Sequence, residues 1–221
     1  MSINQEAAEY KAKVQESLGE KFSIISGDME RVRAAGTLDA ALKVGQLAPD
    51  FTLPDAFGNP VSVSALLARG PVVISFYRGE WCPFCNIELR ALQQALPAME
   101  QLGATLIAIS PERPDYGIVA AEKNKLTFPV LSDFGNKVAR QFGVVFQIGQ
   151  ELKEFSRNVF KNDIALRNGE DSYELPVPAT YVIDTSGLIR FAHVDVDYMT
   201  GRAEPAEVIS ALKAIAHPLG Q

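Results

Sequence analysis

The chain has 221 residues, 47% of them hydrophobic and 22% charged, which is enough for one large domain with a full core. Its formal net charge of −6 argues against a nucleic-acid partner, because phosphate binding needs a basic surface. The sequence shows no signal-peptide pattern and no apolar run long enough to span a membrane, so the cytoplasm is the expected location.

The sequence predicts a helical N-terminal extension over residues 1–45, because the apolar residues Ala7, Tyr10, Val14 and Leu18 recur at helical spacing. We expect this arm to pack on its own domain or to form a homodimer with a second subunit. It carries no nucleophile, so its expected role is in assembly or stability rather than in chemistry.

Residues 46–221 have the pattern of an α/β domain. Continuous apolar, β-branched runs are typical of strands buried on both faces, and helical stripes alternate with them. This alternation predicts a central mixed β-sheet flanked by helices. The expected elements are a hairpin within 47–66, strands at 71–77, 104–109 and 128–131, a helix after Cys85 that Pro97 kinks or ends, helices at 114–125 and 137–142, a helix plus loop within 148–175, a hairpin at 180–192 and a helix at 204–215.

The chain contains two cysteines, Cys82 and Cys85, in a single C-x-x-C motif. Near a β-α-β pattern this spacing indicates redox chemistry. A zinc site would need two more ligands, and the two histidines, His193 and His217, are much too far apart to provide them. We therefore expect no metal and no organic cofactor.

The cysteine motif lies where a buried strand gives way to a helix. Pro83 suits the first helical position, which makes Cys82 the expected N-cap. Helix-terminal amides favour a thiolate there. Cys82 is expected to face solvent, whereas Cys85, on the apolar stripe of the helix, should be more buried and keep the higher pKa.

Several segments resemble known families. Residues 76–85, with Trp81 directly before the first cysteine, look like a thioredoxin-fold active site. The stretch APDFTLPDAFGNPVSVSAL is similar to the opening of the alkyl hydroperoxide reductase/thiol-specific antioxidant family (AhpC/TSA), the peroxiredoxins. ISPERP, FPVLSD and PATYVIDTSGLIRFAHV fit later strands of that family, so the resemblance covers residues 47–216. It implies a peroxiredoxin-like thioredoxin fold.

The family's P-x-x-x-T-x-x-C signature is altered in this chain. With Cys85 on the peroxidatic cysteine, Cys82 replaces the threonine, Arg78 replaces the proline, and the family's distant arginine falls on or near Pro178. That proline resembles the cis-proline that thioredoxins place opposite their cysteines. The resemblance implies Cys82 and Cys85 as catalytic residues and Arg78, Trp81, Pro83, Val177 and Pro178 as substrate-binding residues.

The implied function is a peroxiredoxin-like antioxidant enzyme that cycles Cys82 and Cys85 between dithiol and disulfide. It would reduce hydroperoxides at the expense of thioredoxin or a similar thiol donor. One alternative is a thiol–disulfide oxidoreductase acting on protein disulfides, and another is a redox-sensing or binding protein. The first attacker stays open: thioredoxin logic favours Cys82, particularly for protein disulfides, and peroxiredoxin logic favours Cys85.

Overall fold

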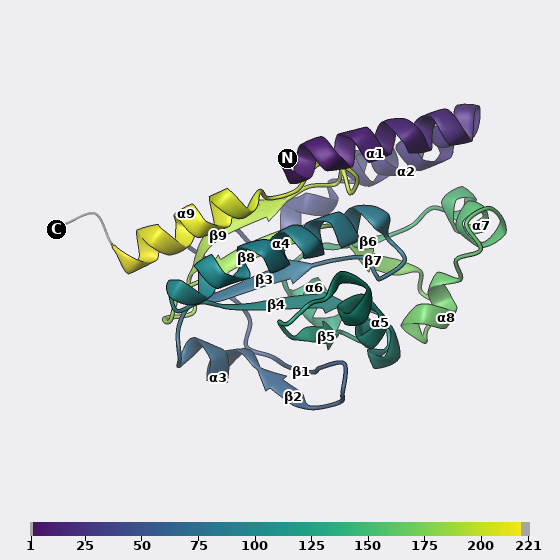
Figure 1. Cartoon of the computed structure of the whole chain (residues 1–221). Coiled ribbons are helices and arrows are strands. Elements are labelled where there is room, and N and C mark those ends of the chain that lie inside the picture. Colours follow the sequence, from purple (N-terminus) through teal and green to yellow (C-terminus); the bar gives the residue numbers. More distant parts are fainter. Residues whose placement is uncertain (1, 218–221) are drawn as a thin grey trace.

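The central element of the fold is a five-stranded sheet, visible in the middle of Figure 1. The computed structural model describes residues 2–217. In spatial order the strands are β5 (Val130–Ser132), β4 (Thr105–Ser110), β3 (Val72–Phe76), β8 (Ala179–Ile183) and β9 (Ile189–Val194). β3 pairs in parallel with β4 and antiparallel with β8, so the sheet is mixed, as the sequence predicts.

The two longest helices after the arm lie together against the sheet. α4 (Pro83–Gln101) packs on β4, and α9 (Pro205–Ala216) contacts α4, β8 and β9. Leu92 and Met99 on α4 are almost fully buried, and each such side chain contributes about 1.5–3 kcal/mol. Because side chains are buried on both sides of Pro97, the helix continues through this residue. Of the two outcomes that the sequence predicts, a kink or an end of the helix at Pro97, the end does not occur.

The core reaches the strand that precedes the cysteines. Every residue of β3 is buried, and Phe76 at its end packs against Phe142, with ring centroids 5.0 Å apart. Phe142 also contacts Tyr181 of β8 at 5.0 Å. The loop that follows Phe76 therefore leaves the centre of the sheet from a rigid base.

The N-terminal extension is helical, as predicted. α1 (Ile3–Leu18) begins with a capping box at Ser2, and a short 3-10 turn (Gly19–Lys21) joins it to α2 (Phe22–Ala34). α1 packs against α4, above it in Figure 1, and Tyr10 contacts Phe84 edge to face with ring centroids 5.3 Å apart. The arm thus packs on its own domain, the first of the two expected arrangements.

The predicted hairpin within 47–66 is present. β1 (Thr52–Pro54) pairs antiparallel with β2 (Pro60–Ser62), and α3 (Val63–Leu67) follows. The helices expected after β4 and β5 are α5 (Pro114–Asn124) and α6 (Lys137–Gln141). Within residues 2–217, no helix combines the length and apolar character that crossing a bilayer requires.

A small third sheet between α6 and β8, beside the central sheet and the β1–β2 hairpin, was not predicted. β6 (Val145–Gln147) pairs antiparallel with β7 (Glu174–Pro176), and α7 (Gln150–Asn158) and α8 (Ile164–Asn168) lie between them. Strands of three residues are too short to show an alternating pattern, and their pairing depends on segments almost thirty residues apart.

Candidate active site

Cys82 caps the N-terminus of α4, as the sequence predicts. Its backbone is extended, its Sγ accepts the N–H of Cys85 at 3.2 Å, and Pro83 takes the first helical position. Both cysteines are free, and their Sγ atoms are 2.6 Å apart. The two sulfurs are therefore close enough to share one proton.

The expectation that Cys82 faces solvent was wrong, because both cysteines are fully buried. The loop after β3 folds back over the start of α4. Arg78 from this loop donates from Nη2 to Cys82 Sγ at 3.0 Å, and its guanidinium lies 3.8 Å from the Tyr198 ring centroid. The Trp81 ring centroid is 5.1 Å from Arg78 Cζ. Arg78 thus both covers the sulfur and places a positive charge beside it.

A second guanidinium approaches from behind the helix, which the sequence did not predict. Arg202 Nη2 lies 3.5 Å from Cys85 Sγ and 2.7 Å from the Tyr198 carbonyl oxygen. Arg202 Nη1 pairs with Glu88 one turn along α4, and Glu88 also accepts from Thr180 at 3.3 Å. Arg202 stands in an irregular loop and has no periodic or motif signal, so only the tertiary structure reveals it. In the alignment with the family signature, Pro178 stands at the position of the distant arginine, so no positive charge is expected there. Arg202 supplies a positive charge beside Cys85 instead.

The charges around the pair reverse the expected order of acidity. Burial by itself raises the pKa of Cys85, but its hydrogen bond with Cys82 and the charges of Arg202 and Arg78 hold this pKa well below its usual value. The pKa of Cys82 is raised well above its usual value by burial and by the hydrogen bond with Cys85, against the opposing charge of Arg78. These opposite shifts favour the thiolate on Cys85, whereas Arg78 and the Cys85 N–H both donate to Cys82 Sγ, so the surrounding donors stabilise one negative charge on the pair.

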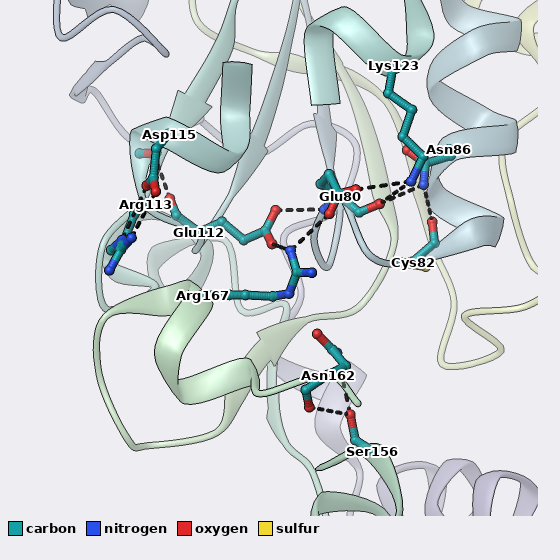
Figure 2. A network of polar contacts seen from close by, with 11 residues as sticks. Glu80, Cys82, Asn86, Glu112, Arg113, Asp115, Lys123, Ser156, Asn162 and Arg167 are labelled. Carbon is teal, nitrogen blue, oxygen red and sulfur yellow. Dashed lines mark hydrogen bonds and ion pairs between the residues drawn. The ribbon is translucent and has the colours of Figure 1, made fainter. Parts of the chain in front are cut away.

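The loop carrying Arg78 is held by the polar network in Figure 2. Glu112 accepts the backbone N–H of Glu80 at 2.6 Å, and Arg167 from α8 bridges the carboxylates of Glu80, at 2.9 Å, and Glu112, at 3.5 Å. Asn86 donates to the carbonyls of Glu80, at 2.7 Å, and Cys82, at 3.0 Å. The network fixes the backbone on both sides of Trp81.

Gly79 is required in this loop by close packing. A Cβ atom at this position would lie 2.3 Å from Trp81 Nε1 and 2.9 Å from Glu112 Cδ. Any larger residue would therefore push Trp81 or Glu112 out of place, and with them the loop that positions Arg78.

Glu112 is expected to make stability depend on pH. Burial raises its pKa from 4.5 to about 7, although the Glu80 N–H and Arg167 oppose this rise. Between these values the folded protein holds a proton that the unfolded chain has released, so the contribution of Glu112 to stability is fully present below pH 4.5 and is lost as pH rises through 7. The shift corresponds to about 3 kcal/mol. In urea unfolding at pH 5 and 8, Glu112→Gln should remove most of this difference, and an unchanged difference would assign it to other groups.

A cavity of about 790 Å³ lies in front of the cysteine loop. Three of the predicted substrate-binding residues, Arg78, Trp81 and Pro83, line it, whereas neither cysteine does. The N-terminal arm forms one wall, with Tyr10 and Lys13 among its side chains. The other lining side chains come mainly from α4, α7, α8 and the segment around Tyr198. They are partly apolar, including Phe84, Ile87, Ile148, Leu152, Phe160, Ile164, Leu175 and Met199, and partly charged or polar, including Glu80, Asn86, Arg90, Lys123, Lys161, Asn162 and Arg167.

Val177 and Pro178 do not line this cavity. Both are buried, and the Val177 N–H donates to the Val144 carbonyl at 2.8 Å, which extends the small β6–β7 sheet. No cis peptide bond occurs in the described part of the chain, so the expectation of a cis-proline at Pro178 was wrong. The backbone pairing of this segment holds it in the core, where Ala179 pairs with Phe76 at the end of β3.

Comparison with known proteins gives consistent matches. The AhpC/TSA family model matches residues 44–192. A protein named Peroxiredoxin Q, chloroplastic, from Sedum lineare is 30% identical over 154 residues, 70% of each chain, and its namesake from Triticum aestivum is 27% identical over 172 residues, 78% of this chain and 68% of the relative. The crystal structure of Peroxidoxin BcpB from Mycobacterium tuberculosis aligns with a TM-score of 0.61 at 26% identity, over 79% of this chain and 98% of that one.

Proposed function

The chain belongs to the AhpC/TSA family of peroxiredoxins, and from this premise we propose that Cys85 is the thiolate that reduces a hydroperoxide and Cys82 the thiol that resolves the product. One observation carries the assignment: Arg202 and Arg78 converge on a buried pair of sulfurs, Arg202 at Cys85 and Arg78 at Cys82, and their charges lower the pKa of Cys85. Thiolates rather than thiols are the reactive form.

The reaction balances with the groups present. The Cys85 thiolate attacks the terminal oxygen of the hydroperoxide, the O–O bond breaks, and Cys85 becomes a sulfenic acid. The alkoxide that leaves takes the proton of the Cys82 thiol. The Cys82 thiolate then attacks the Cys85 sulfur and releases hydroxide, which solvent protonates to water, and a Cys82–Cys85 disulfide forms. A thioredoxin-like dithiol reduces that disulfide and is itself oxidised.

The two guanidinium groups stabilise the charge that develops in this reaction. Negative charge moves from Cys85 Sγ to the leaving oxygen, and Arg78 and Arg202 lie within 3.0 and 3.5 Å of the two sulfurs. Fixed charges in a water-excluded site are worth far more than in solvent. They take over the part played in the family by the threonine and the distant arginine.

The cavity is the expected route for the substrate. Its volume of about 790 Å³ can hold an organic hydroperoxide as well as hydrogen peroxide. Arg78, Trp81 and Pro83 separate the cavity from the buried sulfurs. The substrate oxygen can reach Cys85 only when a side chain of this wall moves.

The test is oxidation of the reduced protein by one equivalent of hydrogen peroxide, followed by stopped-flow fluorescence of the single Trp81 and by thiol counting. We expect both thiols to disappear with the loss of two hydrogens and no covalent dimer, because no other cysteine exists. Slow oxidation by every hydroperoxide, together with rapid reduction of protein disulfides, would overturn the assignment in favour of an exchange enzyme.

A further inference from the structure

The start of the N-terminal arm is tied to the loop that carries Arg202. The side-chain amide of Asn4 donates from Nδ2 to the Arg202 carbonyl at 2.9 Å, and its Oδ1 accepts the Arg202 N–H at 3.3 Å. One side chain on α1 therefore contacts both main-chain polar groups of an arginine 198 residues away, and it shares the Arg202 N–H with the Thr200 carbonyl, which accepts it at 3.1 Å.

A carboxylate two residues after Arg202 strengthens this connection. Glu204 accepts the backbone N–H groups of Ile3 and Asn4, each at 3.0 Å, and the Asn4 side chain at 2.9 Å. The backbone N–H groups of Ile3 and Asn4 belong to the first turn of α1 and have no acceptor within that helix. Negative charge is favoured at this end of a helix. Glu204 is also the N-cap of α9, so the first turns of α1 and α9 are held together around Arg202.

The main chain of Arg202 needs such a fixation. The residue lies in the irregular segment between β9 and α9, and its guanidinium must reach Cys85 from behind α4. Besides Arg202, the titratable or charged groups around Cys85 are Cys82 and Glu88 on α4 and Tyr77 and Arg78 at the end of β3. Arg202 is the charge among them that is placed by contacts with the arm.

We propose that Asn4 is a positioning residue for the peroxidase reaction, because it fixes the main chain of Arg202 so that the guanidinium is held against Cys85. The inference rests on the proposed function. Asn4 and Arg202 both lie outside residues 44–192, which match the family model. The contact between them therefore belongs to the segments that flank the matched region.

The test uses the full chain with Asn4→Ala and, as a matched control, Gln15→Ala, which removes an exposed amide from the same helix. In a Cys82→Ser background, the rate of Cys85 alkylation is measured against pH. We expect Asn4→Ala to raise the apparent pKa of Cys85 and, with both cysteines present, to slow peroxide oxidation about tenfold, less than the full loss of a charge-stabilising donor. The control should change neither.

Asn4→Asp provides a second variant. It keeps the acceptor for the Arg202 N–H but loses both donations and sets a negative charge beside Glu204, so it should be at least as impaired as Asn4→Ala. A lower melting temperature with an unchanged alkylation profile in the folded variants would reduce Asn4 to a structural role and overturn the proposal. Because alkylation needs no peroxide, this result is distinguishable from a failure of the wild-type protein to react with hydroperoxides.

Discussion

Replacing Cys85 with serine is expected to abolish hydroperoxide reduction, with a loss of at least about 10⁴-fold, because no other group can take the place of the nucleophile. Cys82→Ser should behave differently. It retains the Cys85 thiolate and both guanidinium groups, so it should still react once with peroxide and stop at the sulfenic acid. Turnover with a thiol donor that needs the disulfide should then fail.

The measurement combines rapid mixing with mass analysis of each single variant. One oxygen added to Cys82→Ser, with Cys85→Ser unchanged on the same timescale, is the expected pattern. The reverse pattern, a reactive Cys82 and an inert Cys85, would restore the thioredoxin-like order in which the N-cap sulfur attacks first. Alkylation near neutral pH gives an independent comparison, since the thiolate reacts faster than the thiol.

Arg202→Met is expected to have the second-largest effect. It removes a fixed charge from Cys85 Sγ, and loss of one such group commonly lowers the rate by about 10²–10³-fold. It also leaves Glu88 buried without its partner, and breaking a buried pair in this way costs about 3–5 kcal/mol. The rate of peroxide oxidation and urea unfolding measure the two consequences separately.

The double variant Arg202→Met with Glu88→Leu separates chemistry from stability. It replaces a buried ion pair with apolar side chains of similar size, a change that is often neutral for folding. Its stability should return close to that of the wild-type protein while peroxide oxidation stays slow. Recovery of the rate together with the stability would mean that Arg202 supports the fold and has no part in the reaction.

The local features of the active site could be predicted from the sequence. The β-branched run before Phe76 forms a buried strand, and Pro83 after Cys82 starts a helix, because both patterns depend on neighbouring residues only. The N-cap position of Cys82 follows from the same local rules. Arg78 was named from the family resemblance, because it stands at the position of the signature proline four residues before Cys82.

The electrostatics of the site were decided by the tertiary structure. Arg202 reaches Cys85 from 117 residues away, and the Arg78 side chain seals Cys82 by stacking on Tyr198, which is equally remote in sequence. Burial and charges from distant segments set the pKa of each sulfur, and no pattern within α4 encodes them. The sequence by itself therefore determined the strand, the helix and the cysteine pair, whereas which sulfur carries the charge depended on long-range packing.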